Sequence, residues 1–152
     1  MALFCARSAP KAASFDGQTF ASVDPRLSKL LDTMRELGAD FTVVEMLRSV
    51  EDQEKAISKG ASMVKDAVTA PHVRGVAADL KANPDDMSGY LALARIAAQA
   101  SELLGIEVRW GGAWKTLTTQ IDPAEQVVRY KQIKAGHGEA PFIDPGHFEL
   151  RG

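Results

Sequence analysis

The sequence predicts a single α+β domain, chiefly because of the order in which its helical and strand-like segments follow one another. These segments are interspersed without the regular βαβ spacing of a parallel sheet. A length of 152 residues leaves no room for a second domain of ordinary size, and an apolar share of 45% is typical of globular proteins. We therefore expect one hydrophobic core, built from helices and a small sheet.

Apolar residues at helical spacing, bounded by capping and helix-ending residues, predict three amphipathic helices. Their expected bounds are Asp24 to Gly38, Ser49 to Gly60, and Asp85 or Asp86 to Gly105. Short segments with strand-forming residues predict four strands, at 41–45, 76–80, 106–110 and 147–150. Residues 1–20 are expected to form a poorly ordered arm ahead of a domain at 21–152, and the stretch from about 116 to 141 carries little pattern.

Charge and cysteine content exclude several classes of partner and site. The formal net charge is -2 and the basic residues are scattered, whereas a nucleic-acid-binding protein normally concentrates them on one face. Cys5 is the single cysteine, so an intrachain disulfide and a thiolate metal cluster are both excluded. A metal site in this chain must use nitrogen and oxygen ligands.

The sequence contains no run of apolar residues long enough for a membrane span, which takes about 18. The apolar segment at residues 2–6 is too short for the core of a secretory signal. We therefore expect synthesis in the cytoplasm, so a target outside the membrane would have to be reached by another route.

Two segments combine histidine with an acidic residue. His72 precedes Asp79 across a glycine turn, and Asp144 precedes His147 by three residues at the start of the last expected strand. Two imidazoles and one carboxylate suffice to hold a catalytic zinc ion with a fourth position open. Spacing alone leaves the more ordinary interpretation open, in which all four are polar turn residues.

Three segments together resemble a family of zinc peptidases that includes phage L-alanyl-D-glutamate endolysins and D-alanyl-D-alanine carboxypeptidases and dipeptidases. Residues 72–79 match His-x-x-Gly-x-Ala-x-Asp, residues 144–149 match acid-x-x-His-Phe-Glu, and residues 110–114 read Trp-Gly-Gly-Ala-Trp. An upstream Leu-Arg-Ser with a following Gln, at 47–53, also fits the family. The resemblance spans about residues 20–150 and is closest to the endolysin branch.

The resemblance implies a fold, a metal and a catalytic group. The fold would be the D-Ala-D-Ala peptidase or hedgehog-like one, a small antiparallel sheet backed by helices with a zinc cleft. One Zn²⁺ would be held by His72, Asp79 and His147, with Asp144 as the catalytic acid/base. For Asp144 the alternative is a turn residue before a proline.

Five further residues are candidates near the site. Arg48 would stabilise charge on the scissile carbonyl, with Gln53 close to it, and Glu149 would orient a ligand imidazole from the same strand face. Trp110 and Trp114 would lie beside the cleft. The alternatives are a solvated arginine, a structural ion pair for Glu149, and tryptophans that serve packing alone.

The sequence departs from the family pattern in three places. Ala70 replaces a usual serine, Met46 replaces a usual glycine, and 32 residues separate Trp114 from His147 where the endolysins have a short stretch. We expect this insertion, at about 117–142, to form a flap or lobe over the cleft. His137 lies within it between two glycines and is expected to be a surface histidine in a flexible loop.

The expected function is zinc-dependent hydrolysis of the L-alanyl-D-glutamate bond in the peptidoglycan stem. A D-alanyl-D-alanine carboxypeptidase or dipeptidase and a non-catalytic zinc module of the same fold remain as alternatives. The expected partners are stem peptides of the bacterial wall and a holin-type pore that gives the enzyme access to the wall. A monomer is expected, with neither a nucleic-acid partner nor a membrane span.

Overall fold

The computed structural model describes residues 14–15, 18–19, 22–60 and 70–152. Its main sheet has five antiparallel strands in the order β3-β4-β7-β5-β6. Their bounds are β3 (Phe41–Glu45), β4 (Ala77–Ala82), β5 (Glu107–Trp110), β6 (Lys115–Thr116) and β7 (His147–Arg151). A separate two-stranded antiparallel sheet pairs β1 (Ser14–Phe15) with β2 (Gln18–Thr19). The expected α+β class and antiparallel sheet are confirmed, while most of the arm predicted at 1–20 lies outside the described residues.

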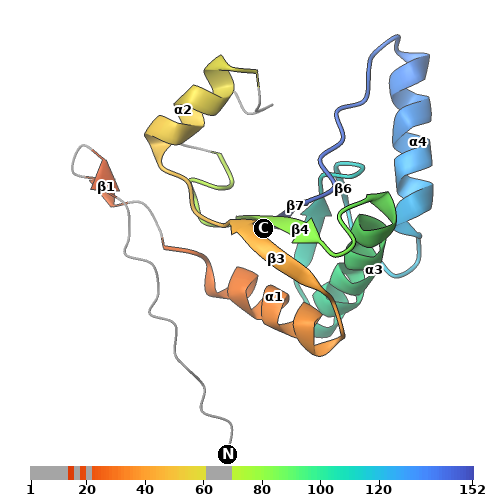
Figure 1. Cartoon of the computed structure of the whole chain (residues 1–152), viewed down its shortest axis with the longest axis horizontal. Coiled ribbons are helices and arrows are strands. Elements are labelled where there is room, and N and C mark those ends of the chain that lie inside the picture. The colour runs from red at the N-terminus through yellow and green to blue at the C-terminus, as the bar shows by residue number, and fades with distance from the viewer. Residues whose placement is uncertain (1–13, 16–17, 20–21, 61–69) are drawn as a thin grey trace, which may run out of the picture.

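The helices are α1 (Pro25–Glu36), α2 (Val50–Ser58), α3 (Met87–Leu104) and α4 (Pro123–Gly136). Helices α1 and α3 lie along one face of the sheet, whereas α2 and α4 stand towards its opposite ends (Figure 1). The N-caps of the first three are Asp24, Ser49 and Asp86, and each side chain accepts a backbone N–H of the first turn. These caps confirm the three helices predicted from the sequence.

Helix α4 lies in the stretch 116–141, where the sequence carries little pattern. Its apolar pattern is weak because its buried residues are Pro123, Gln126 and Val127, clustered in its first turns. Asp122 caps it by accepting the N–H of Ala124 at 2.9 Å. His137 is the C-cap of this helix and donates its backbone N–H to Ile133, so the flexible loop predicted around it is wrong.

Alternation along the strands separates the core from the site. Leu80 of β4 and Phe148 and Leu150 of β7 belong to the core packed against α1 and α3. Asp79 and His147, which alternate with them, therefore project from the opposite face of the sheet. Within the described part of the chain, no helix combines the length and the apolar character needed to cross a membrane.

Candidate metal centre

The site is built on the register between β4 and β7. Asp79 of β4 is the direct partner of His147 of β7, so their side chains leave the sheet on the same face. His147 is 7% exposed, and its Nδ1 lies 3.1 Å from Oδ1 of Asp79. The strand pairing therefore brings together one imidazole and one carboxylate that are far apart in the sequence.

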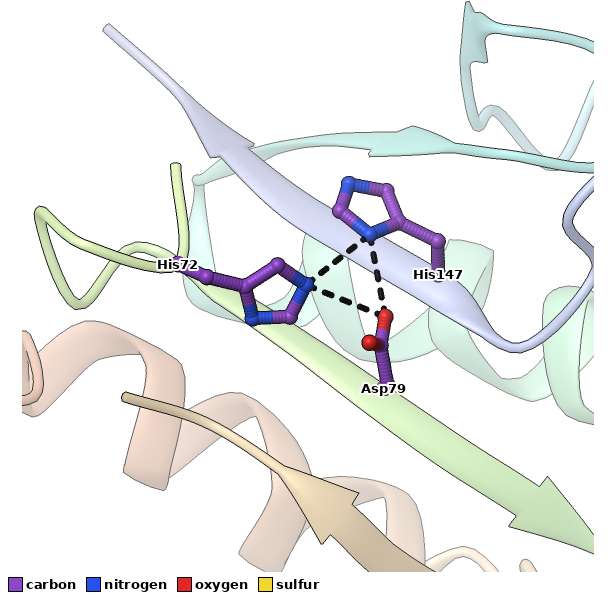
Figure 2. A group of neighbouring side chains, drawn as sticks. All are labelled: His72, Asp79 and His147. Carbon is purple, nitrogen blue, oxygen red and sulfur yellow. Dashed lines mark hydrogen bonds and ion pairs between the residues drawn. The ribbon is translucent and has the colours of Figure 1, made fainter. Parts of the chain in front are cut away.

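The second imidazole comes from the turn that leads into β4. The N–H of Arg48 donates to the carbonyl of His72 at 3.1 Å, and Gly75 ends the turn with a φ of 70°. A side chain at Gly75 would collide with the backbone of Ser22, 2.7 Å from its Cβ position, so the turn requires glycine. This turn points the His72 ring towards the Asp79–His147 pair (Figure 2).

Three atoms converge on one point. The Nε2 of His72 lies 3.1 Å from Oδ1 of Asp79 and 3.3 Å from Nδ1 of His147 (Figure 2). Ligands in a tetrahedral zinc site, each about 2.0–2.2 Å from the metal, lie roughly 3.3–3.6 Å apart. The donor set and its spacing therefore fit a zinc ion with little rearrangement.

The electrostatics of this group reflect the two imidazoles around one carboxylate. Burial raises the pKa of Asp79, but hydrogen bonds from His147 and His72 outweigh it and hold that pKa well below its usual range. Burial lowers the pKa of His147, but hydrogen bonds to Asp79 and Glu149 raise it to about 9 overall. The group therefore stabilises positive charge close to the Asp79 carboxylate, as a cation site must.

The second nitrogen of His147 is also engaged. Its Nε2 lies 3.0 Å from Oε2 of Glu149, which is 4% exposed. Glu149 stands two residues further along β7 and on the same face, the placement that the sequence predicted. When the ring is neutral, as a metal ligand must be, an Nε2–H that donates to this carboxylate leaves Nδ1 as the lone-pair nitrogen facing Asp79 and His72.

Asp144 lies on the segment between α4 and β7, residues 137–146, which we call the strap. Its backbone N–H donates to the carbonyl of Gly111 at 3.0 Å, and its carbonyl accepts the N–H of His147 at 3.2 Å. Burial raises the pKa of the Asp144 carboxyl, and the charge of Asp79 raises it further, against smaller opposing effects of the two histidines. Asp144 therefore lies within electrostatic reach of all three donors.

Arg48 lies on the other side of Asp79, with its NH2 group 3.8 Å from Oδ2 of that carboxylate. Glu45 binds the guanidinium in a bidentate manner, at 2.7 Å from Nε and 2.6 Å from NH2. The third nitrogen donates to the buried Gln53 at 2.6 Å. No feature of the sequence singled out Glu45, because its contact with Arg48 depends on how β3 and the loop to α2 are placed.

The two tryptophans occupy different environments. Trp110 is fully buried and donates its indole N–H to the carbonyl of Pro145 at 2.8 Å, so it packs beneath the strap that carries Asp144. Trp114 is partly exposed, and its ring centroid lies 5.4 Å from that of His147. Of the two, Trp114 is thus the one that borders the metal centre.

Ala70 and Met46, which replace residues usual in the resembling family, both pack against apolar neighbours. Ala70 is 1% exposed and forms a small cluster with Val50 and Val73. Met46 packs on the edge of the main core. The Nδ1 atom of His72 is buried and has no hydrogen-bond partner among the described residues. Ala70 offers no hydroxyl that could serve it.

An α+β domain that gathers two imidazoles and one carboxylate on one sheet face has the kind of site found in metal-dependent hydrolases. Comparison with known proteins identifies the kind of hydrolase. The family model of phage L-alanyl-D-glutamate peptidases matches residues 11–150. The L-alanyl-D-glutamate peptidase of Escherichia phage T5 is 33% identical over 137 residues, which cover 86% of this chain and 90% of that protein. The chain therefore belongs to the phage L-alanyl-D-glutamate peptidase family.

A solved structure agrees with this assignment. The crystal structure of the Serratia marcescens L-Ala D-Glu endopeptidase ChiX is similar with a TM-score of 0.61 and 26% sequence identity. The similarity covers 85% of this chain and 80% of that one. The chain is thus a peptidase by family, and its fold is one that an enzyme of this specificity uses.

Proposed function

We propose that the protein is a zinc-dependent peptidoglycan peptidase that hydrolyses the L-alanyl-D-glutamate bond of the stem peptide. The observation that carries the proposal is the convergence of His72, Asp79 and His147 in a member of this family. Both relatives described above are named for the same bond. The metal would be held by Nε2 of His72, Oδ1 of Asp79 and Nδ1 of His147.

The identity of the metal is argued from the donors. Neutral imidazole and carboxylate ligands in a four-coordinate arrangement suit zinc, and three protein ligands leave one position open for catalysis. When bound, zinc supplies a Lewis acid and lowers the pKa of water towards ~7. The buried Glu149 supports the assignment, since a carboxylate on the outer nitrogen is the usual partner of a metal-bound histidine.

Asp144 is proposed as the acid/base of the reaction. A carboxylate oxygen of Asp144 takes a proton from the attacking water and later delivers it to the leaving amine. Its place within electrostatic reach of the three donors supports this role, because an acid/base must lie close to the reacting water. Its position on the strap before β7 keeps it next to His147.

Arg48 is proposed to steady the negative charge that develops on the scissile carbonyl. Glu45 and Gln53 hold its guanidinium beside Asp79, so the cation is fixed before substrate binds. Trp114 is proposed to border the bound stem peptide next to His147. Trp110 supports the strap from below.

The experiment is digestion of purified peptidoglycan by the full chain loaded with Zn²⁺, with the new termini identified by mass spectrometry. We expect new N-terminal D-glutamate and C-terminal L-alanine, and loss of cutting in Asp144→Asn while zinc content stays at one per chain. Asp32→Asn, a substitution of an exposed acid on α1, across the sheet from the donors, is the matched control and should cut normally. Release of free D-alanine would instead indicate a carboxypeptidase, and zinc binding without cutting of any wall preparation would indicate a non-catalytic module.

The proposed substrate implies where the enzyme acts. We propose that the enzyme acts on the bacterial cell wall as a monomer and reaches it through a holin-type pore. Expression in a bacterial host with and without a co-expressed holin tests this route. Lysis that depends on the holin would support it, and equally fast lysis without one would contradict it.

A further inference from the structure

Arg109 contacts Glu149, the residue that holds the outer nitrogen of His147. It stands on β5 directly opposite Glu149 of β7, so the two side chains leave the sheet on the same face. Its NH1 group donates to Oε1 of Glu149 at 3.0 Å. This contact was not foreseen from the sequence, because it depends on the register between two strands about 40 residues apart.

The carboxylate of Glu149 is thereby divided between two partners. Its Oε2 faces Nε2 of His147 at 3.0 Å, and its Oε1 faces Arg109. A buried carboxylate needs such partners, because an unpaired charge away from water is costly. Arg151 is the other cation near Oε1, but it is 3.7 Å away and its side chain is 54% exposed. Arg109 is therefore the contact that sets the direction of the carboxylate.

Arg109 is itself fixed in place. Its Nε donates to the carbonyl of Trp114 at 3.3 Å, and its guanidinium carbon lies 5.1 Å from the centroid of the Trp114 ring. The planar guanidinium thus stacks on an aromatic ring while its fork reaches both a carbonyl and a carboxylate. A lysine could supply the charge but only one of these contacts.

We infer that Arg109 is a positioning residue for the metal centre, acting through Glu149. It holds the carboxylate where Glu149 accepts the Nε2–H of His147, which leaves Nδ1 of His147 as the nitrogen that faces the metal. The inference rests on the proposed zinc site. It adds that the contacts from Arg109 to Glu149 and from Glu149 to His147 select the tautomer of the His147 ligand.

The test is the Zn²⁺ affinity of the full chain, measured by competition with a chelator, for Arg109→Met, Glu149→Gln and the double variant. Each single variant should bind Zn²⁺ about 10-fold or more weakly, the usual loss when an outer partner of a metal-bound histidine is removed. Because Arg109 acts through Glu149, the two losses should not add. The double variant should bind Zn²⁺ about as tightly as whichever single variant has the lower affinity. Fold losses that multiply in the double variant would overturn the inference.

Two matched variants separate positioning from general support of the fold. Arg151→Met removes the exposed cation near the same oxygen and should bind Zn²⁺ like the wild type. Arg109→Lys should bind Zn²⁺ more tightly than Arg109→Met and less tightly than the wild type. If thermal melting shows that Arg109→Met does not fold, Arg109→Lys is compared with the wild type in its place. An Arg109→Lys protein that binds as weakly as Glu149→Gln, or an Arg109→Met protein that binds normally, would each contradict the inference.

A spectroscopic measurement reports on the tautomer directly. In the zinc-loaded wild type the Nε2–H proton of His147 should be visible by NMR, since its hydrogen bond to Glu149 slows exchange with water. In Arg109→Met this signal should be lost or weakened, and in Arg151→Met it should persist. A wild type that binds no Zn²⁺ would instead refute the proposed function, whereas normal zinc binding with an unchanged His147 signal in Arg109→Met refutes only the role of Arg109.

Discussion

The indole N–H of Trp114 donates to the carbonyl oxygen of Phe142 at 2.7 Å, and the two aromatic rings stack with their centroids 5.9 Å apart. The hydroxyl of Tyr130 in α4 donates to the same carbonyl at 3.1 Å and accepts the N–H of Phe142 at 3.3 Å. The insertion thus contacts the residue beside the metal centre through the backbone of Phe142, whose carbonyl binds both Tyr130 and Trp114. Helix α4 and the strap after it hold the indole that lies next to His147.

Tyr130→Phe should loosen this connection. The hydroxyl makes both hydrogen bonds to Phe142, so its loss should cost about 1 kcal/mol of stability and let Trp114 move. With fluorotryptophan incorporated, the Trp114 signal should broaden or shift in the NMR spectrum while that of the buried Trp110 stays unchanged. Tyr90→Phe, which removes a hydroxyl bound to Asp85, is the control and should leave both signals in place. An unaltered Trp114 signal in Tyr130→Phe would contradict the connection.

Gly111→Ala should damage both stability and the metal centre. A Cβ at this position would lie 2.3 Å from the carbonyl oxygen of Asp144 and 3.0 Å from Cβ of His147. The backbone must shift to admit it, at a cost of about 1–3 kcal/mol, and the shift displaces a ligand. Urea unfolding and Zn²⁺ titration measure the two effects. Gly136→Ala, at the end of α4 with no atom within 4 Å of its Cβ, should be neutral or stabilising, and equal effects at both positions would contradict the packing argument.

The metal-free protein should lose stability as the pH rises above about 6.5. The folded-state pKa of His147 is about 9, above the value of about 6.5 in an unfolded chain. Its contribution to stability is therefore fully present below about pH 6.5 and disappears as the pH rises through 9. The melting temperature in EDTA should fall across this window and fall less in His147→Gln. With saturating Zn²⁺ the fall should vanish, since protons no longer occupy the ligand. A constant melting temperature in EDTA from pH 6.5 to 9 would show the assignment to be wrong.

Glu45→Gln should weaken catalysis without affecting metal binding. The substitution removes the charge that holds Arg48 in a bidentate pair, and it leaves His72, Asp79 and His147 in place. We expect kcat/KM on a stem-peptide substrate to fall by roughly 10-fold or more, with zinc content unchanged. In an Arg48→Met background the same substitution should have little further effect.

The control for Glu45→Gln is Asp52→Asn. Asp52 is an exposed acid in the first turn of α2 that influences Arg48 only at a distance. The Asp52→Asn variant should keep wild-type activity. If Glu45→Gln and Asp52→Asn behave alike, the bidentate pair does not position Arg48.

Elements with strong local patterns were predictable from the sequence. The Leu stripe and Asp-Pro cap of α1, the Ser49 cap of α2 and the glycine stop of α3 each specify a helix through contacts close in sequence. The convergence of His72, Asp79 and His147 was also predicted, from motifs and not from physics alone. Sequence spacing by itself did not distinguish these residues from turn residues, because the β4–β7 register decides which side chains meet.

The missed features have physical reasons. Helix α4 buries a short first segment and exposes Val128 and Ile133, so its apolar residues do not form a clear stripe. Its Asp122-Pro123 start is the same signal as Asp24-Pro25 in α1, and it would have found the helix. Glu45 and Arg109 were missed because their partners are set by a loop and by strand register, neither of which leaves a mark on the local sequence.

The central position of β7 makes the metal centre dependent on the register of two strand pairs. His147 pairs with β4, while Glu149 on the same strand is opposed to Arg109 of β5. A one-residue slip of this strand would turn both side chains into the core and bring Phe148 and Leu150 to the other face. The three donors therefore meet only when β7 pairs with β4 in this register. Correct packing of the core and assembly of the donor group therefore depend on the same strand register.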